Sequence, residues 1–154
     1  MPFKVHIVPP PTLKSLLVHN RVYDRLCSYS RNCIICPNGK PGDCTTKDVV
    51  YRITCVSCSS IYIGETGRPL RARIAEHVRS IRSPVNPCYA DTPWAKHVRA
   101  HHGGAPVNVH VSIMSRGGGP LLRKVKEANL IRSLSPSINC KSEVESFGLL
   151  LTSA

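Results

Sequence analysis

Two short β-branched runs on either side of a Cys-x2-Cys pair constrain the fold of this chain more than any other feature. Residues 47–54 contain Val-Val-Tyr-Arg-Ile-Thr, and residues 60–64 read Ser-Ile-Tyr-Ile-Gly. Alternating β-branched and aromatic residues over such lengths are typical of strands, and the short interval between the runs leaves room only for a turn. The sequence therefore predicts a β-hairpin whose turn carries Cys55 and Cys58.

The periodicities that follow extend the hairpin into a small domain. Apolar residues recur at helical spacing over 70–81, just after a proline, and over 121–134, just before Ser-Pro. A shorter helix is predicted from Pro93 to His101, because two glycines follow it, and alternation over 107–113 predicts a third strand. The order β-β-α-α-β-α predicts an α/β (α+β) fold with a small central three-stranded antiparallel sheet flanked by helices.

This pattern divides the chain into three segments. Residues 1–46 are rich in Pro, Ser, Asn and Arg, and we expect a basic, cysteine-containing linker with a small zinc knuckle there. Residues 47–142 form the folded domain, and residues 143–154 remain as a C-terminal tail.

The eight cysteines indicate metal binding more than disulfides. The first 20 residues carry lysines and three consecutive prolines where a secretion signal would need an uninterrupted apolar core. No run of about 18 apolar residues is present, so we expect no membrane span. We therefore expect an intracellular protein in a reducing compartment, where clustered thiols are more often metal ligands.

One candidate zinc site combines the hairpin turn with the short helix. Cys55 and Cys58 can direct two thiolates at one ion, and His97 with His102 can complete a tetrahedral set. His101 is a rival ligand, because it lies four residues after His97 and shares its helical face. We favour His102, since the adjoining glycine suggests that the helix is already unwinding there. The alternative is a reduced turn with unrelated surface histidines.

A second candidate zinc site lies in the predicted linker. Its four thiols come from Cys27, Cys33, Cys36 and Cys44, although the five-residue first gap is loose. Cys88 and Cys140 show no paired spacing, and we interpret them as small buried residues.

Another set of residues offers the groups that phosphodiester hydrolysis needs. The reaction requires a base for water, cations for the phosphate and usually a divalent metal. Tyr51 and Tyr62 lie on the two hairpin strands, Arg73 and His77 share one face of the next helix, and Glu127 lies on the last helix. Strand tyrosines more often pack in a core, so composition alone does not decide between the two roles.

The order and spacing of these residues resemble the GIY-YIG nuclease family. The resemblance covers residues 47–142 and is closest to the endonuclease domain of Penelope-like retroelements. The matching positions are Val49-Val50-Tyr51, then Tyr62-Ile63-Gly64 after ten residues, then Arg73, His77, Glu127 and Pro136-x2-Asn139. The first motif departs from the family by having two valines in place of Gly-Ile, but it keeps the tyrosine.

The resemblance implies a GIY-YIG type fold and a role for each matching residue. Tyr51 would be the general base, with its pKa lowered by Arg73 and the metal, and Tyr62 would order water and phosphate. Arg73 would bind the scissile phosphate with help from His77. Glu127 would hold one Mg²⁺ or Mn²⁺ on the leaving-group side, and Asn139 would brace the site. In the retroelement endonucleases two cysteines lie between the tyrosine motifs and pair with two downstream histidines, so the resemblance also implies zinc at Cys55, Cys58, His97 and His102.

The charge of the chain favours a polyanionic partner. Lys and Arg number 21 against nine Asp and Glu, which gives a formal net charge of +12. Such an excess attracts phosphate backbones without reading sequence. We expect DNA to contact basic residues on the first and last helices and near them: Arg68, Arg71, Arg116, Arg123 and Lys126.

The resemblance, together with the charge, thus implies a divalent-metal-dependent DNA endonuclease, derived from or part of a retroelement, and we expect it to act in the nucleus. A reverse transcriptase domain or protein of the same element would be its partner, because no polymerase signature is present. The alternative is a zinc-containing nucleic-acid-binding module that has kept the fold and lost cleavage. Retention of all six matching site residues favours the enzyme.

Overall fold

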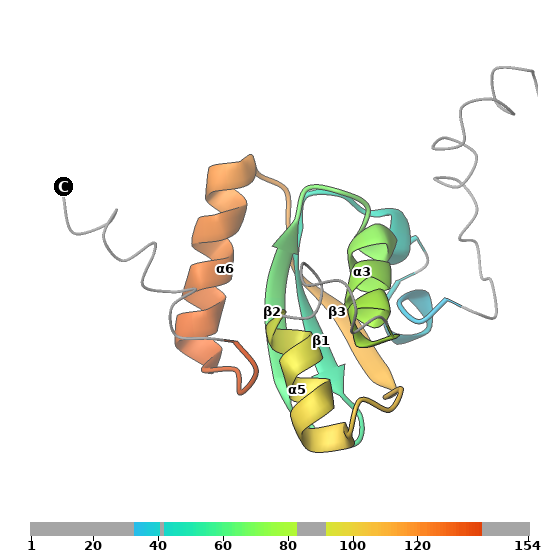
Figure 1. Ribbon diagram of the computed structural model, residues 1–154. Coiled ribbons are helices and arrows are strands. Elements are labelled where there is room, and N and C mark those ends of the chain that lie inside the picture. The colour runs from blue at the N-terminus through green and yellow to red at the C-terminus, as the bar shows by residue number, and fades with distance from the viewer. Residues whose placement is uncertain (1–32, 41, 83–91, 140–154) are drawn as a thin grey trace, which may run out of the picture.

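The structure is a computed structural model that describes residues 33–40, 42–82 and 92–139 (Figure 1). Its elements follow the order that the sequence predicts, with two short 3-10 helices before the first strand. They are η2 (Cys36–Asn38), η3 (Asp43–Thr45), β1 (Val49–Cys55), β2 (Ile61–Thr66), α3 (Leu70–Arg82), α5 (Pro93–His102), β3 (Val109–Arg116) and α6 (Pro120–Leu134). The mixed α/β fold with a three-stranded antiparallel sheet is confirmed.

The sheet has the order β2-β1-β3, so the first strand is central and pairs antiparallel with both neighbours. The third strand runs to residue 116, three residues beyond the expected alternation over 107–113, because its pairing with β1 continues to Val49. The β1–β3 pairing has a register shift between Val50 and Tyr51, the mark of a β-bulge or similar irregularity.

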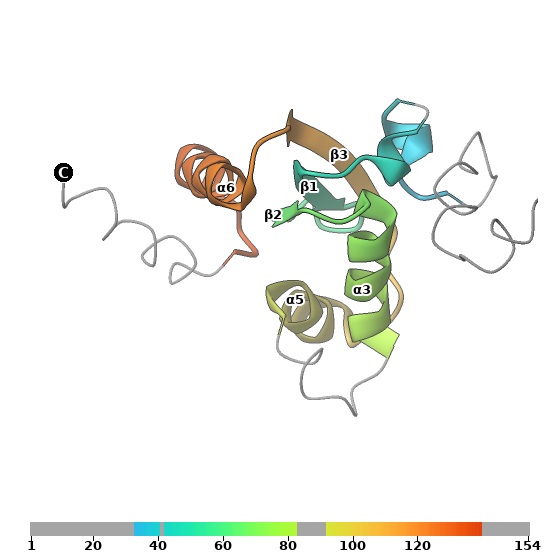
Figure 2. The ribbon, with the colours of Figure 1, turned by 90° about the horizontal axis from the view of Figure 1, so that it is seen from above.

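Helices cover both faces of the sheet, as the view from above shows (Figure 2). Helices α3 and α5 pack on the face that carries Tyr51 and Ile53, together with Leu70, Trp94 and Val98. Helix α6 covers the other face, where a smaller cluster joins Val50, Ile63 and Ile131. The two apolar clusters lie on opposite sides of the same strands, which is the expected result of period-2 alternation.

Local signals set the ends of α5. The Thr92 side chain accepts a hydrogen bond from the Ala95 amide, Pro93 occupies the first turn, and Gly103 ends the helix in the left-handed conformation at φ 60°. The helix is regular through His102. The expectation that it unwinds at this residue is therefore wrong.

The segment from Cys33 to Thr46, which we expected in a linker, packs onto the domain. Ile35 and Cys44 are buried in the same cluster as Tyr51. The Leu70 amide, at the start of α3, donates to the Thr46 carbonyl at 3.0 Å. The boundary predicted at residue 46 therefore runs through a packed region.

Among the helices that the structure describes, none combines the length and apolar character needed to cross a membrane.

Candidate active site and metal centres

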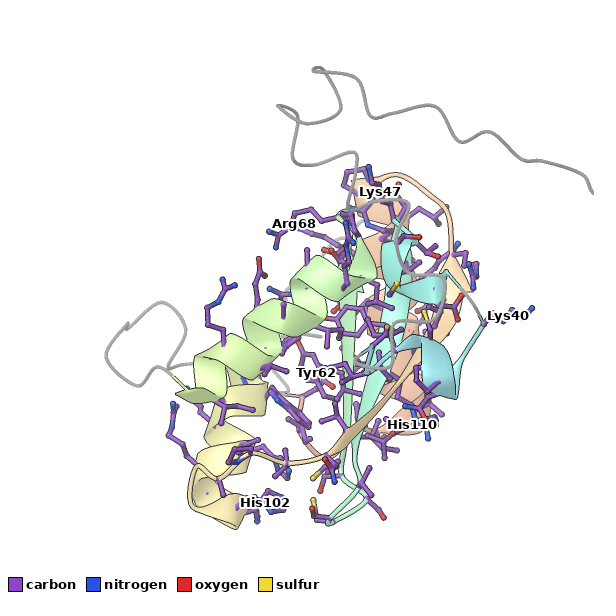
Figure 3. All side chains as sticks on the ribbon, turned by 90° about the vertical axis from the view of Figure 1, so that its right-hand side faces the viewer. Lys40, Lys47, Tyr62, Arg68, His102 and His110 are labelled. Carbon is purple, nitrogen blue, oxygen red and sulfur yellow. The ribbon has the colours of Figure 1, made fainter. Side chains whose placement is uncertain are left out.

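The hairpin register brings the two tyrosines to one face of the sheet. Tyr51 lies opposite Gly64, and Tyr62 lies opposite Ile53 on the neighbouring strand. Helix α3 crosses this face, and the His77 ring makes edge contacts with both tyrosine rings at centroid distances of 6.0 and 5.2 Å. Figure 3 shows Tyr62 beneath this helix.

A hydrogen-bonded trio forms the centre of this face. The Tyr51 hydroxyl lies 2.8 Å from His77 Nε2, and Arg73 Nε donates to the same hydroxyl at 3.3 Å. Arg73 and His77 are four residues apart on α3, so one helical face presents both to the strand. Residues predicted from separate motifs thus lie in direct contact.

Gly64 allows this close approach, although sequence reasoning gave it no role of its own. A Cβ at this position would lie 2.6 Å from the Tyr51 hydroxyl oxygen and 3.0 Å from Tyr62 Cε1. Real Cβ atoms do not reach such distances, so only glycine fits without displacing a ring. A glycine inside a strand is itself a signal of close approach.

Burial sets the electrostatics of the trio. Tyr51 is 0% exposed, and burial together with the Tyr62 charge raises its pKa well above the usual value, against a lowering effect of Arg73. Burial and the neighbouring Arg73 charge lower the pKa of His77 to about 3. His77 is therefore neutral at neutral pH, and its Nε2 can accept the proton of the Tyr51 hydroxyl. Arg73 does act to lower the pKa of Tyr51, as expected. The pKa is raised overall, because burial outweighs this effect.

Glu76 is a second residue that the sequence did not single out. Its carboxylate binds Arg73 Nη1 at 3.1 Å and Arg68 Nη1 at 2.7 Å. Burial acts to raise the pKa of Glu76, but hydrogen bonds from these two arginines outweigh it and lower the pKa. Glu76 thus holds Arg73 beside the tyrosine, while Arg68, just before the start of α3, stays largely exposed (Figure 3).

Glu127 reaches the trio electrostatically from α6. The residue is partly buried, and its charge contributes to the raised pKa of Tyr51. Asn139 takes a different position, because its side-chain amide both donates to and accepts from the backbone of Ile63 at 2.8 Å. It pairs with the outer edge of β2 and fixes the chain that follows α6.

The predicted DNA-contacting residues are divided between surface and interior. Arg123 is only 7% exposed, and it binds Asp48 at 2.6 Å and Glu65 at 2.8 Å. The expectation that Arg123 is exposed to DNA is therefore wrong. Its side chain points from α6 toward the sheet, where both carboxylates lie. Arg116 pairs with the buried Asp43 but keeps about half of its side chain exposed. Lys126 donates to the carbonyls of residues 116 and 117, and Arg71 is partly exposed.

The first cysteine and histidine set comes together at the hairpin tip. Ligand atoms of Cys55, Cys58, His97 and His102 all lie within 4.8 Å of one another. Cys55 Sγ lies 3.4 Å from His102 Nε2, and Cys58 Sγ lies 3.5 Å from His97 Nε2. Usual zinc bond lengths at a tetrahedral angle put sulfur and nitrogen ligands about 3.6 Å apart. The cluster could therefore bind a metal ion such as zinc.

His102 joins this cluster and His101 does not. His101 is exposed, although it lies on the His97 face and its ring centroid is 5.0 Å from that of His97. His102, in the last turn of α5, points toward the hairpin tip instead (Figure 3). Hydrogen bonds from Ser60, with smaller contributions from His102 and Cys55, lower the pKa of Cys58 to about 6. The thiolate that zinc requires is thus favoured near neutral pH.

A second cluster joins Cys33, Cys36 and Cys44, whose sulfur atoms also lie within 4.8 Å of one another. It too could bind a metal ion. Cys27, the fourth predicted ligand, lies outside the described residues, as do Cys88 and Cys140.

No model of a known protein family, no curated protein and no solved structure matches this chain. A function has to be inferred from the residues themselves and their geometry.

Proposed function

We propose that the protein is a divalent-metal-dependent endonuclease of the GIY-YIG type that hydrolyses phosphodiester bonds of DNA. The observation that carries the proposal is the contact of the Tyr51 hydroxyl with His77 Nε2 and Arg73 Nε, within electrostatic reach of Glu127. A proton acceptor, a cation and a carboxylate are the groups that phosphodiester hydrolysis uses.

Arg73 supplies the cation. About a third of its side chain is exposed, while Glu76 and Tyr51 fix its orientation. A guanidinium held in this way can donate to a phosphate oxygen and offset charge that develops in the transition state.

Tyr51 and His77 supply a route for the proton. As water attacks phosphorus, its proton passes to the Tyr51 oxygen and the hydroxyl proton of Tyr51 passes to His77 Nε2. The pKa of His77 is low in the free protein, but a bound phosphate anion would offset the Arg73 charge and favour the imidazolium form. Because Tyr51 is fully buried, the step also requires a side-chain shift on substrate binding that admits water. Tyr62, which is 5% exposed, lies beside this path and would help to order water and phosphate.

Glu127 is the proposed ligand of the catalytic metal. Mg²⁺ is usually held by one or two carboxylates, with water and substrate phosphate completing its shell, so one carboxylate whose charge acts on Tyr51 fits this ion. When bound, Mg²⁺ or Mn²⁺ would stabilise negative charge on the leaving oxygen. Asn139 would act by fixing the chain that follows α6.

Zinc would have a structural role in the proposed enzyme. An ion held by Cys55, Cys58, His97 and His102 would join the hairpin tip to the end of α5. The same hairpin presents both tyrosines, so zinc would stabilise their geometry without taking part in the reaction.

The net charge of +12 supports DNA as the substrate. Four members of the predicted contact set remain at least partly accessible to it: Arg68, Arg71, Arg116 and Lys126. We keep a retroelement origin, with a reverse transcriptase as partner, as part of the same proposal.

The complete burial of Tyr51 favours one competing function, a nucleic-acid-binding module that no longer cleaves. Incubation of purified protein with supercoiled plasmid, with Mg²⁺ or with chelator, separates the two. The enzyme produces nicked circles only with metal, and Tyr51→Phe loses about 10²- to 10⁴-fold in rate, the usual contribution of general base catalysis. Plasmid binding without cleavage under every metal condition would support the module instead.

A further inference from the structure

Three thiols gather at a site that the proposed nuclease does not use. Cys33 precedes η2, Cys36 begins it, and Cys44 lies in η3. Their sulfur atoms lie within 4.8 Å of one another, and none is in a disulfide. The Cys36 amide lies 3.5 Å from Cys33 Sγ and donates to it. This hydrogen bond holds the Cys33 sulfur beside the start of η2.

The spacing of the sulfurs fits one ion. Zinc-sulfur bonds of the usual length at a tetrahedral angle separate two sulfurs by about 3.8 Å. The observed upper limit of 4.8 Å requires each sulfur to move by less than an ångström toward a common centre. A set of soft thiolates selects zinc over Mg²⁺ or Ca²⁺ among the ions common in cells.

The segment that carries these thiols has little regular secondary structure. Residues 33–46 contain two 3-10 helices of three residues each and, within the described part, no strand. Yet the segment supports two parts of the domain. The Thr46 carbonyl accepts from the Leu70 amide at the start of α3, and Asp43 binds Arg116 at the end of β3.

We propose that Cys33, Cys36 and Cys44 bind a second zinc ion, separate from the one at the hairpin tip. The ion locks residues 33–46 into the shape that supports the start of α3. A further ligand completes its tetrahedral shell. The site is structural, and it exists whether or not the protein cleaves DNA.

Zinc content per chain in reduced protein tests the proposal. Wild-type protein contains two ions, Cys44→Ser contains one, Cys58→Ser contains one, and the double variant contains none. Ile35→Val is the matched control, because it trims a buried neighbour of Cys36, keeps every thiol and retains both ions. Two ions retained in Cys44→Ser, or a single ion in wild type that Cys58→Ser removes, would overturn the second site.

X-ray absorption at the zinc edge keeps the test valid if Cys44→Ser fails to fold. In Cys58→Ser the remaining ion has a shell dominated by sulfur at about 2.3 Å. Scattering from imidazole rings as the main outer-shell signal of that ion would contradict the assignment.

Amide exchange reports the structural role of the ion. Partial removal of zinc from the second site speeds exchange of the Leu70 amide, because its acceptor at Thr46 loses support. Unchanged exchange at Leu70 after loss of this ion would overturn the proposed link to α3.

Discussion

Replacement of Gly64 by alanine perturbs the proposed site without touching any of its charged groups. The new Cβ would lie 2.6 Å from the Tyr51 hydroxyl oxygen and 2.8 Å from Tyr51 Cζ. Neither atom can move independently, since one belongs to the rigid aromatic ring and the other is bonded to it, and Tyr51 is 0% exposed. The ring therefore has to move away from β2, and the 2.8 Å contact with His77 Nε2 is lost.

The cost follows from two effects. Overpacking of a well-packed core costs about 1 to 3 kcal/mol, and loss of one hydrogen bond adds about 0.5 to 1.5 kcal/mol. We therefore expect Gly64→Ala to lower the free energy of unfolding by about 2 to 4 kcal/mol. If the proposed function is correct, plasmid nicking falls by at least the factor expected for Tyr51→Phe.

Urea unfolding measures the change, and a double-mutant cycle locates its cause. In a Tyr51→Phe background the closest clash is gone, so Gly64→Ala should cost less there, with a coupling of about 1 kcal/mol or more. Gly119→Ala is the matched control, because its Cβ meets no atom within 4 Å and its φ is −65°. A Gly64→Ala protein as stable as wild type would refute the packing argument. So would a Gly64→Ala cost that is the same in the wild-type and Tyr51→Phe backgrounds.

Three further predictions concern stability. Arg123→Met should lower the free energy of unfolding by about 2 to 4 kcal/mol, because it leaves the carboxylates of Asp48 and Glu65 without their buried cation. Urea unfolding at neutral pH measures this cost, and an unchanged free energy of unfolding would contradict the prediction. Asn139→Ala should lower the free energy of unfolding by about 1 to 3 kcal/mol, since it removes both hydrogen bonds to the Ile63 backbone. Faster exchange of the Ile63 amide would show that the loss arises at this position. His77 has a pKa of about 3 in the folded chain against about 6.5 unfolded, so the stability it contributes is complete above pH 6.5 and is lost as the pH falls toward 3. Wild-type protein should lose about 2 kcal/mol between pH 6.5 and 5 relative to His77→Gln, and parallel pH profiles of the two would exclude this role.

Local signals explain why much of the fold could be predicted. Thr92, Pro93 and Gly103 mark the ends of one helix, and each acts through contacts within a few residues. The hairpin follows from alternation together with a short turn. His102 lies beside Cys55 as predicted, but for a different reason. Helix α5 does not unwind at this residue, and the side chain reaches the hairpin tip from a regular last turn.

Contacts between distant segments explain what sequence reasoning missed. Arg123 lies on a helix with other basic residues, and its burial depends on Asp48 and Glu65, which are 75 and 58 residues away along the chain. Glu76 stands one position before His77 on α3, but only the fold shows that it holds Arg73. The same limit applies to residues 33–46, whose composition resembles a linker although tertiary contacts bury part of them.

Cleavage of supercoiled plasmid by Glu127→Gln tests the central proposal most directly. The substitution keeps the shape of the side chain, removes the carboxylate proposed to hold the catalytic metal and leaves the basic surface intact. Glu145→Gln, an equal change of charge outside the described residues, is the control. We expect wild type and Glu145→Gln to nick plasmid with Mg²⁺, and Glu127→Gln to bind DNA with unchanged affinity but not to nick it. Nicking by Glu127→Gln at the wild-type rate would contradict the proposed metal site, and absence of nicking in wild type with Mg²⁺ or Mn²⁺ would contradict the endonuclease itself.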